Sequence, residues 1–375
     1  MSSWFLNYLL TFAISILLGG LIIPKILDIA FSRQLFDDVN ERKIHKGGVP
    51  RLGGISFLPA IGVSICLVVG TNFLLGEQMT QFATGDAIAQ SLFLVCGLLL
   101  IYLVGIVDDL IGLRYRAKFL FQAIAALLLI IAGVRIGNLD GFLWIHGLPL
   151  WVSWLLTWFV IIFVMNAINL IDGIDGLASG LTAIALLWYS CVFFVAGMYP
   201  QLLLCAATIG TLVPFFYYNV FHSVESQRKI FMGDTGSLTI GLILVFLTVK
   251  VFNIPETNSP GETNLFILAI APIMVPCFDV VRVFFHRVRR GRNPFLADKC
   301  HIHHKLLALG MKQGEALITI LLCDALFILV NLWLSPHMQP TWLVLCDIAV
   351  WTGANIILTH FIRRRENRMK IKLFD

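Results

Sequence analysis

Apolar stretches of about 20 residues recur from one end of the chain to the other, separated by short polar segments. A helix of that length crosses roughly 30 Å of hydrocarbon. The pattern predicts an all-α, polytopic integral membrane protein that forms one membrane domain over residues 1–375. The stretches correspond to about eleven spans: 4–26, 52–75, 89–107, 118–136, 150–170, 177–197, 201–221, 236–253, 264–285, 314–334 and 341–362.

The composition supports the same class of protein. Of the 375 residues, 58% are hydrophobic and 13% are charged, whereas soluble globular domains carry about 25% charged residues. No stretch is left over for a soluble domain of any size. We therefore expect the lipid bilayer as the surrounding partner, and no nucleic-acid partner.

Charge alternates between the connecting segments and predicts an orientation. Nearly all Lys and Arg residues lie in one set of segments: 32–51, 110–118, 222–230, 286–312 and 363–372. The opposite segments carry acids and almost no bases: 76–88, 137–149, 254–263 and 335–340. Because Lys and Arg concentrate on the cytoplasmic side, we expect the N-terminus outside, the C-terminus in the cytoplasm and a basic cytoplasmic tail at 363–375.

Four patches of polar residues interrupt the apolar pattern at the ends of predicted spans. Carboxylates, Asn and His are costly near a bilayer, so they are expected where they are paired or do chemistry. All four patches face the cytoplasm in the predicted topology, which indicates a metal-dependent phosphoryl-transfer site there. The loops expected to form this site are 32–51, 108–118, 166–177, 222–237 and 286–312.

The first patch is the adjacent pair Asp108 and Asp109, at the end of the third span. Two neighbouring carboxylates repel each other, so a cation should stabilise them, and Lys118 follows in the next short loop. The pair could organise a phosphate site with Lys118 as the clamp, or either Asp could be a base that deprotonates an attacking phosphate. The alternative is a helix end with a solvated turn.

The second patch ends the fifth span. Residues three apart are neighbours on a helix, so Asn166, Asn169 and Asp172 should share one face. Asp175 should lie on the loop that follows, since glycines end the helix there. Amide and carboxylate oxygens are hard ligands that suit Mg²⁺ or Mn²⁺. The alternative is a capped helix end with Asp-Gly turns.

The third patch opens the eighth span with Phe231, Asp234, Thr235 and Ser237. A helix N-terminus favours anions, so Asp234 would need a metal between its carboxylate and a phosphate. Phe231 could stack on a nucleobase. Thr235 and Ser237 occupy positions where N-caps are expected, and capping is the alternative function for these two residues.

The fourth patch, His301, His303 and His304, lies after Cys300 in the long basic loop before the tenth span. The spacing is too tight for one tetrahedral zinc site, which favours contacts between the histidines and a pyrophosphate. A solvated histidine cluster is the alternative.

A glycine-rich basic segment, Lys46 to Gly54, leads into the second span and contains Arg51. It lacks the order of a Walker A motif. Arg51 and the glycine backbone could cradle phosphate, and a simple interfacial loop is the alternative.

These patches, in this order and at these span ends, resemble the polyprenyl-phosphate N-acetylhexosamine-1-phosphate transferase family over nearly the whole chain. The resemblance implies transfer of a sugar-1-phosphate from a UDP-sugar to a polyprenyl phosphate, with release of UMP. It also implies a multi-pass protein of the bacterial cytoplasmic (inner) membrane with its active site facing the cytoplasm. A homodimer is expected by analogy.

The resemblance implies roles for individual residues. Asp234 looks like the principal Mg²⁺ ligand and Asn169 a second, with Mn²⁺ able to substitute. Substrate contacts are implied for Phe231 on uracil and for the histidine loop on sugar and phosphate, and Asn166 and Arg51 are further candidates. The catalytic candidates are Asp108, Asp109, Lys118, Asp172 and Asp175.

The loop from Asn293 to His304 is similar to that of the UDP-GlcNAc:undecaprenyl-phosphate transferases. Those enzymes start O-antigen, enterobacterial common antigen or teichoic acid linkage units. The muramoyl-pentapeptide branch carries three consecutive His residues, whereas Ile302 interrupts them here. We therefore expect UDP-GlcNAc and undecaprenyl phosphate as substrates, with the muramoyl-pentapeptide phosphotransferase of peptidoglycan synthesis as the alternative.

An anion transporter is the rival from a different class. It would place ionisable residues near the bilayer midplane, along a path that reaches both faces. The candidates are Asp279, Asp324 and Asp347, which are too few for such a path. Asp279 could instead pair with Arg282, and the other two could be polar contacts between the last two spans.

Overall fold

The structure, a computed structural model, describes residues 2–35, 48–76, 85–255, 257, 263–293 and 300–370. Parts of five predicted connecting segments, 32–51, 76–88, 254–263, 286–312 and 363–372, lie outside these ranges, including Lys46 and Asp298. Within the described ranges the single β pairing is an isolated bridge between Asn138 and Gly147. The α-helices are α1 (Ser2–Ser32), α2 (Phe57–Leu74), α4 (Gly85–Ile111), α5 (Tyr115–Ile131), α6 (Leu150–Ile171), α7 (Leu177–Val195), α8 (Tyr199–Val220), α9 (Gly233–Phe252), α10 (Leu265–Ile270), α11 (Met274–Arg289), α12 (Ile302–Ala308), α13 (Gln313–Leu334) and α14 (Pro340–Met369). The 3₁₀ helices are η1 (Gly53–Ser56), η2 (Phe142–Trp144), η3 (Val224–Ser226) and η5 (Ala271–Ile273).

The predicted class is confirmed, because ten segments in the described part of the chain are long and apolar enough to cross a membrane. The predicted span 118–136 corresponds to α5, which has 17 residues and ends at Ile131. At 1.5 Å per residue α5 is about 25 Å long, less than the roughly 30 Å of hydrocarbon. Whether α5 crosses the membrane is therefore not decided by its length, and the number of spans stays a prediction. The orientation of the termini also stays a prediction.

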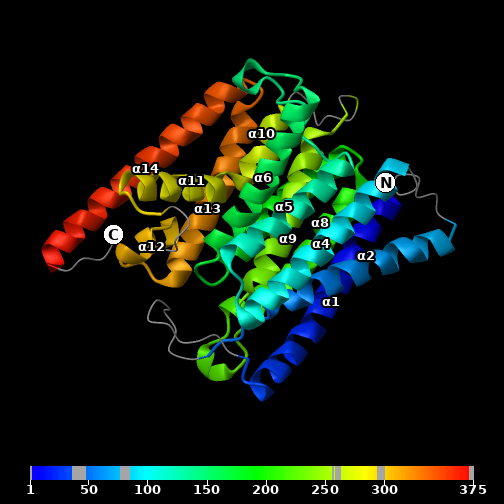
Figure 1. The fold of residues 1–375 in the computed structure, drawn as a ribbon, viewed down its shortest axis with the longest axis horizontal. Coiled ribbons are helices and arrows are strands. Elements are labelled where there is room, and N and C mark those ends of the chain that lie inside the picture. The colour runs from blue at the N-terminus through cyan, green and yellow to red at the C-terminus, as the bar shows by residue number, and fades with distance from the viewer. Residues whose placement is uncertain are drawn as a thin grey trace.

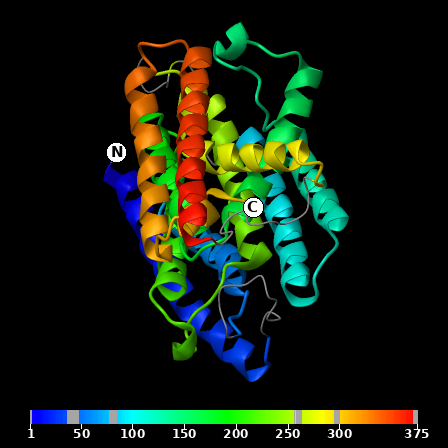
Figure 2. The same ribbon diagram turned by 90° about the vertical axis from the view of Figure 1, so that its left-hand side faces the viewer.

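The predicted span 264–285 is broken into two helices. α10 ends at Ile270, and η5 with Pro272 separates it from α11. Proline has no backbone N–H and interrupts the helical hydrogen-bond ladder. Figure 2 shows α11 lying across the direction of α13 and α14, so the second half of this segment turns away from the bundle axis.

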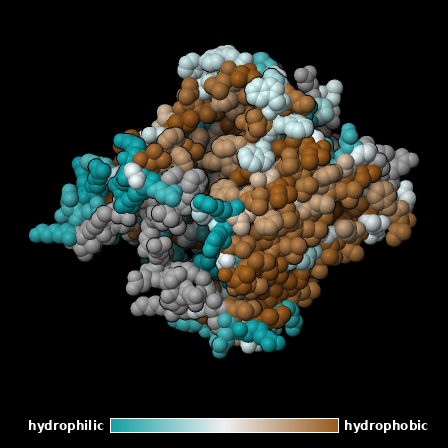
Figure 3. Space-filling view, viewed as in Figure 1, coloured by the Kyte–Doolittle hydropathy of each residue, from teal (hydrophilic) through white to brown (hydrophobic). Residues whose placement is uncertain are grey.

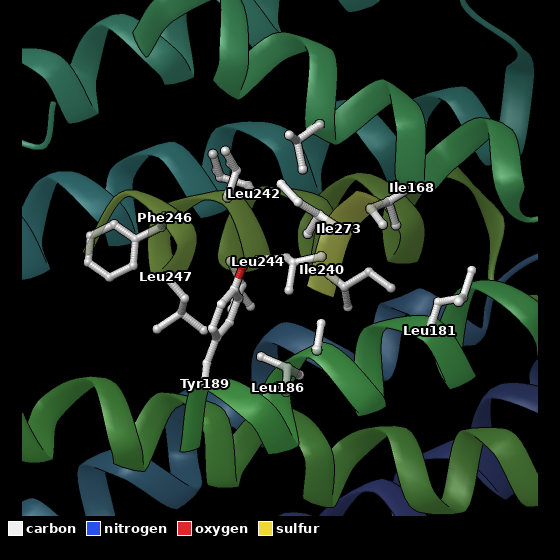
Figure 4. Packing of buried hydrophobic residues seen from close by; sticks show 14 of the residues in the cluster. Ile168, Leu181, Leu186, Tyr189, Ile240, Leu242, Leu244, Phe246, Leu247 and Ile273 are labelled. Carbon is white, nitrogen blue, oxygen red and sulfur yellow. The ribbon is translucent and has the colours of Figure 1, made fainter. Parts of the chain in front are cut away.

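Helix α9 lies in the middle of the bundle, with α4, α6 and α7 around it (Figure 1). Of the apolar stretch of α9, 94% is buried inside the protein. In Figure 4, Ile240 and Leu244 of α9 pack against Leu186 and Tyr189 of α7. The neighbouring helices also come close to the backbone, since a Cβ atom at Gly241 would lie 3.0 Å from the Cα atom of Met165 on α6. Helix α9 therefore faces protein rather than lipid.

The surface of the molecule separates into apolar and polar regions. Figure 3 shows a broad hydrophobic surface over the bundle, with hydrophilic residues gathered at the left, where α11 and α14 end, and at the bottom. The bottom of this view is where α1 ends and η3 lies. These hydrophilic regions include described parts of the basic segments 222–230, 286–312 and 363–372.

Candidate functional site

A lysine joins three helix ends at the centre of the site. Lys118, in the first turn of α5, has its Nζ atom 2.7 Å from Oδ2 of Asp108 in the last turn of α4. The same Nζ atom donates a hydrogen bond to Oδ2 of Asp234 in the first turn of α9. Asp108 is held from its other side, because the amide of Leu113 donates to Oδ1 at 2.6 Å. The structure thus brings together three predicted residues that lie up to 126 positions apart.

Asn169, near the end of α6, completes the hydrogen bonding of Asp234. Its Nδ2 atom donates to Oδ1 of Asp234 at 2.6 Å and to Oγ of Ser237 at 2.8 Å. The two residues predicted to hold a metal are therefore neighbours. Asp234 is oriented through both carboxylate oxygens, by Lys118 and by Asn169.

Asp109 lies next to Asp108 in the chain but faces the N-terminus of α9. Its Oδ1 atom accepts from the amide of Asp234 at 2.7 Å. Its Oδ2 atom accepts from the amide and the hydroxyl of Thr235, at 2.9 and 2.6 Å. Free amides at a helix N-terminus favour a carboxylate acceptor. The geometry favours a capping function for Asp109, while Asp108 faces Lys118.

The close approach of α4 and α9 depends on a glycine. A Cβ atom at Gly105 would lie 2.4 Å from the Cα atom of Thr235. Gly105 is one helical turn before Asp109, so the missing side chain lets the acidic pair reach the start of α9.

Lys229 and Asn219, which were not among the predicted site residues, fix the loop that follows α6. Lys229 forms a buried ion pair with the predicted residue Asp175, with Nζ 2.6 Å from Oδ2. Asn219, at the end of α8, accepts from the amide of Gly176 at 2.6 Å and donates to the carbonyl of Ile230 at 2.8 Å. This loop is thereby joined to the segment that precedes Asp234. Lys229 lay in the predicted basic segment 222–230, whereas no sequence pattern singled out Asn219.

Asp172 is a predicted site carboxylate that lies outside the membrane spans and has a raised pKa. It follows the last residue of α6 and is exposed. Desolvation by the surrounding protein, followed by repulsion from Asp234 and Asp175, raises the pKa of Asp172 to about 7, and Arg51 opposes this shift. Asp172 is therefore suited to exchange a proton near neutral pH.

The glycine-rich segment before α2 runs beside the start of α9. The amide of Phe231 donates to the carbonyl of Pro50 at 2.8 Å, and the amide of Gly53 donates to the carbonyl of Phe231 at 3.0 Å. A Cβ atom at Gly54 would lie 2.1 Å from the amide nitrogen of Gly236, so only glycine allows this approach. Arg51, in the same segment, is exposed.

Asn166 has a different environment from Asn169. Its Nδ2 atom donates to Oε1 of Gln122 on α5 at 2.6 Å and to the carbonyl of Ile162 at 2.7 Å. Asn166 lies about one helical turn before Asn169, where its amide links α5 to α6. Its predicted contact with substrate stays a prediction.

The histidine loop reaches the site through His303. Its ring packs against Gly173, where a Cβ atom would lie 2.2 Å from Nε2. Burial, with the neighbouring charge of His304 as the next contribution, lowers the pKa of His303 to about 3. His303 is therefore neutral at physiological pH and lies beside Asp172.

His301 and Asp279 form a second contact of this loop, at 2.8 Å. Asp279 also pairs with Arg282 at 2.8 Å, as predicted.

The donor set of the site suits a hard divalent cation in kind. The carboxylates of Asp108 and Asp234 both contact the ammonium of Lys118, and the amide of Asn169 contacts Asp234. Asp172 is near enough to Asp234 for their charges to repel each other. Oxygen donors of these types are those that Mg²⁺ prefers. Among the described residues, however, no three Asp, Glu, His or Cys side chains converge closely enough to form a metal site by themselves.

Comparison with known proteins gives a consistent result over most of the chain. Residues 91–252 match the family described as glycosyl transferase family 4. The undecaprenyl-phosphate alpha-N-acetylglucosaminyl 1-phosphate transferase of Salmonella typhimurium is 29% identical over 359 residues, which cover 91% of this chain and 92% of that protein. The protein of the same name from Escherichia coli K12 is 27% identical over 89% of each chain. A probable undecaprenyl-phosphate N-acetylglucosaminyl 1-phosphate transferase of Bacillus subtilis is 30% identical, over 86% of this chain and 83% of that protein.

Proposed function

Because the chain belongs to the polyprenyl-phosphate N-acetylhexosamine-1-phosphate transferase family, we propose that it transfers GlcNAc-1-phosphate from UDP-GlcNAc to undecaprenyl phosphate. The products are GlcNAc-diphospho-undecaprenol and UMP. The reaction is then the first membrane step of a cell-surface glycan of the O-antigen, common antigen or teichoic acid type. It takes place at the cytoplasmic face of the bacterial inner membrane.

One observation carries the proposal: Lys118 lies between Asp108 and Asp234, and Asn169 holds the second oxygen of Asp234. The four residues come from four helix ends at one place in a membrane protein. A concentration of oriented charge at a membrane boundary is costly unless it does chemistry. An acceptor lipid with its tail in the bilayer and its phosphate at the surface matches such a location.

The chemistry is an exchange of one P–O bond for another. A phosphate oxygen of undecaprenyl phosphate attacks the β-phosphorus of UDP-GlcNAc and forms a new P–O bond. The bond from the β-phosphorus to the bridging oxygen breaks, and UMP leaves with that oxygen. Such reactions depend mainly on positioning and charge neutralisation, for which Lys118, Arg51 and the histidine loop are available. Asp108 is the candidate base for a protonated acceptor phosphate, and a route through a covalent Asp intermediate is the alternative.

Asp234 and Asn169 are the residues that would hold Mg²⁺, or Mn²⁺ in its place. The ion would supply neutralisation of the negative charge on the diphosphate. Lys118 and Asn169 keep the Asp234 carboxylate in one orientation, and Asp109 fixes the helix end from which Asp234 projects. Phe231, next to this helix end, is the residue that we propose contacts the uracil ring.

The test is UMP release in membranes that contain the chain, with UDP-GlcNAc, undecaprenyl phosphate and Mg²⁺. We expect lipid-dependent UMP that disappears with EDTA and falls by at least about 100-fold in Asp234→Asn, the usual size for removal of a positioned charge. Asp28→Asn is the matched control, since Asp28 lies on α1 and its side chain is 74% exposed. We expect this control to keep the wild-type rate.

The outcomes separate the alternatives. UMP release only with UDP-MurNAc-pentapeptide would move the protein to the muramoyl-pentapeptide branch. An Asp234→Asn variant with an unchanged rate at saturating Mg²⁺ would exclude Asp234 as a metal ligand. No UMP with any UDP-sugar, from protein that is folded and membrane-inserted, would overturn the proposed transfer.

A further inference from the structure

A carboxylate from another helix fastens the loop that carries His301. Asp279, on α11, is fully buried and accepts three hydrogen bonds. Its Oδ2 atom is 2.8 Å from Nδ1 of His301, and its Oδ1 atom accepts from the amide of Ile302 at 3.0 Å and from Arg282 at 2.8 Å. A buried carboxylate is stable only when its partners compensate the lost hydration. Two of these three partners belong to the histidine loop.

Arg282 extends the contact by one residue. The Nη2 atom that donates to Asp279 also donates to the carbonyl of Cys300 at 2.5 Å. Asp279 and Arg282 together therefore hold three consecutive residues, 300–302. Helix α12 begins at Ile302, and its own N-cap, His301, provides no side-chain capping bond. Asp279 supplies that bond from α11, so the start of α12 is positioned by tertiary contacts.

The contact with Asp279 also selects a tautomer of His301. A carboxylate beside one ring nitrogen keeps the proton on that nitrogen, which here is Nδ1. The opposite nitrogen, Nε2, makes no hydrogen bond with any residue that the structure describes. The His301 ring stacks on the ring of His303, with centroids 5.8 Å apart and planes 3° apart. His303 in turn packs against Gly173, beside Asp172.

We propose that Asp279 is a positioning residue for the transfer reaction. It holds His301 as the Nδ1–H tautomer in one orientation, with Arg282 fixing the backbone, so that Nε2 is available to bind the UDP-sugar. This inference rests on the proposed function. Asp279 itself does not touch substrate; it acts through His301.

A double-mutant cycle tests whether Asp279 acts through His301. We expect Asp279→Asn to lower kcat/KM by about 10- to 100-fold, as for the loss of a residue that orients a ligand-binding His. In the His301→Ala background, the same substitution should change kcat/KM by less than about twofold, because the ring it orients is gone. An equal loss in both backgrounds would overturn the proposal. Asp324→Asn, on α13, controls for removal of a buried carboxylate elsewhere, and we expect the wild-type kcat/KM.

A second measurement does not need enzyme activity. In ¹⁵N-histidine NMR spectra of the detergent-solubilised protein, the signals missing from His301→Ala identify His301. We expect a protonated Nδ1 and an unprotonated Nε2 in the wild type, and loss of this preference in Asp279→Asn. A wild-type His301 protonated on Nε2 alone would overturn the proposal, whether or not UMP is released. The expected tautomer together with no UMP release would count against the proposed function instead.

Discussion

Asp108 and Asp109 are adjacent in the chain and point to different partners. Successive residues on a helix are about 100° apart, so one carboxylate turns toward Lys118 and the other toward the amides at the start of α9. Asp108 therefore faces the site, and Asp109 holds the start of α9 in place. Mutual repulsion is limited because each carboxylate has its own donors.

Substitution of each Asp by Asn should separate the two functions. Asp109→Asn would turn an amide N–H₂ toward a backbone N–H, so we expect a loss of about 1 kcal/mol in the free energy of unfolding, the usual size for a lost cap. Asp108→Asn should have a smaller effect on the thermal midpoint and lower UMP release by about 100-fold. Thermal unfolding in detergent and UMP release from the same preparations check both. Equal losses of stability in the two variants would contradict the assigned functions.

At the scale of elements, the site depends on helix ends that approach each other through glycines. Gly54 of η1 meets the backbone of Gly236 on α9, and Gly105 of α4 meets Thr235. Small residues allow such close backbone contact in membrane bundles. Neither contact has room for a methyl group, so a change in either glycine moves the start of α9 and Asp234 with it.

Gly54→Ala should therefore lower both the thermal midpoint and UMP release. The added Cβ atom would lie 2.1 and 2.3 Å from the backbone nitrogen and Cα atoms of Gly236, which cannot be relieved by rotating a side chain. Gly62→Ala is the matched control, because it adds the same methyl group on α2 with no atom within 4 Å. A Gly54→Ala variant with the properties of Gly62→Ala would show that the close approach is not needed.

Helix α12 is held to α14 by a buried lysine whose ionisation is altered. Lys305 donates to the carbonyl and Oδ1 of Asn355 and to the hydroxyl of Thr359. Burial, with Arg282 as the next contribution, lowers the pKa of Lys305 to about 8 from an ordinary value of 10.5. Between these two values the unfolded chain binds more protons at this position than the folded protein. The free energy of unfolding therefore rises with pH across this window.

The measurement compares wild type with Lys305→Met. We expect the thermal midpoint of the wild type, relative to the variant, to increase from about pH 8 to about pH 10 and to be constant below that range. The comparison cancels the titration of other lysines. Parallel pH profiles would show that Lys305 has an unaltered pKa.

At the scale of the whole molecule, the class of protein could be predicted from sequence, and so could four polar residues that the structure brings together. Most of their pairings could not be predicted. Asp108, Lys118, Asn169 and Asp234 stood out because polar residues are rare at span ends, and the structure brings them together. Asn219 and Asp279 have equally specific contacts. Asn219 is a lone polar residue within an apolar stretch, and for Asp279 only the pairing with Arg282 could be expected from sequence. Periodicity does not say which distant segment such a residue will meet. The predicted span 118–136 extends past the end of α5 at Ile131, because the turn at Gly133 lies within the apolar stretch.

The orientation of the molecule is a prediction that can be tested directly. The basic segments 222–230, 286–312 and 363–372 should lie in the cytoplasm. A green fluorescent protein fused after residue 375 should fluoresce, and alkaline phosphatase at the same position should be inactive in intact cells. Active phosphatase at that position would reverse the topology and place the site on the outer face.

The burial of α9 has a consequence for biogenesis. Most of its packing partners, α4, α6, α7 and η1, precede it in the chain, and α10 follows it. The ribosome therefore synthesises most of the helices that surround α9 before α9 itself. Chains fold during synthesis in the same order, from the N-terminus. We expect a nascent chain released before residue 233 to leave the position of α9 open to lipid or to a chaperone. The contacts of Asp234 with Lys118 and Asn169 then form when α9 enters, before the histidine loop at the start of α12 has been synthesised.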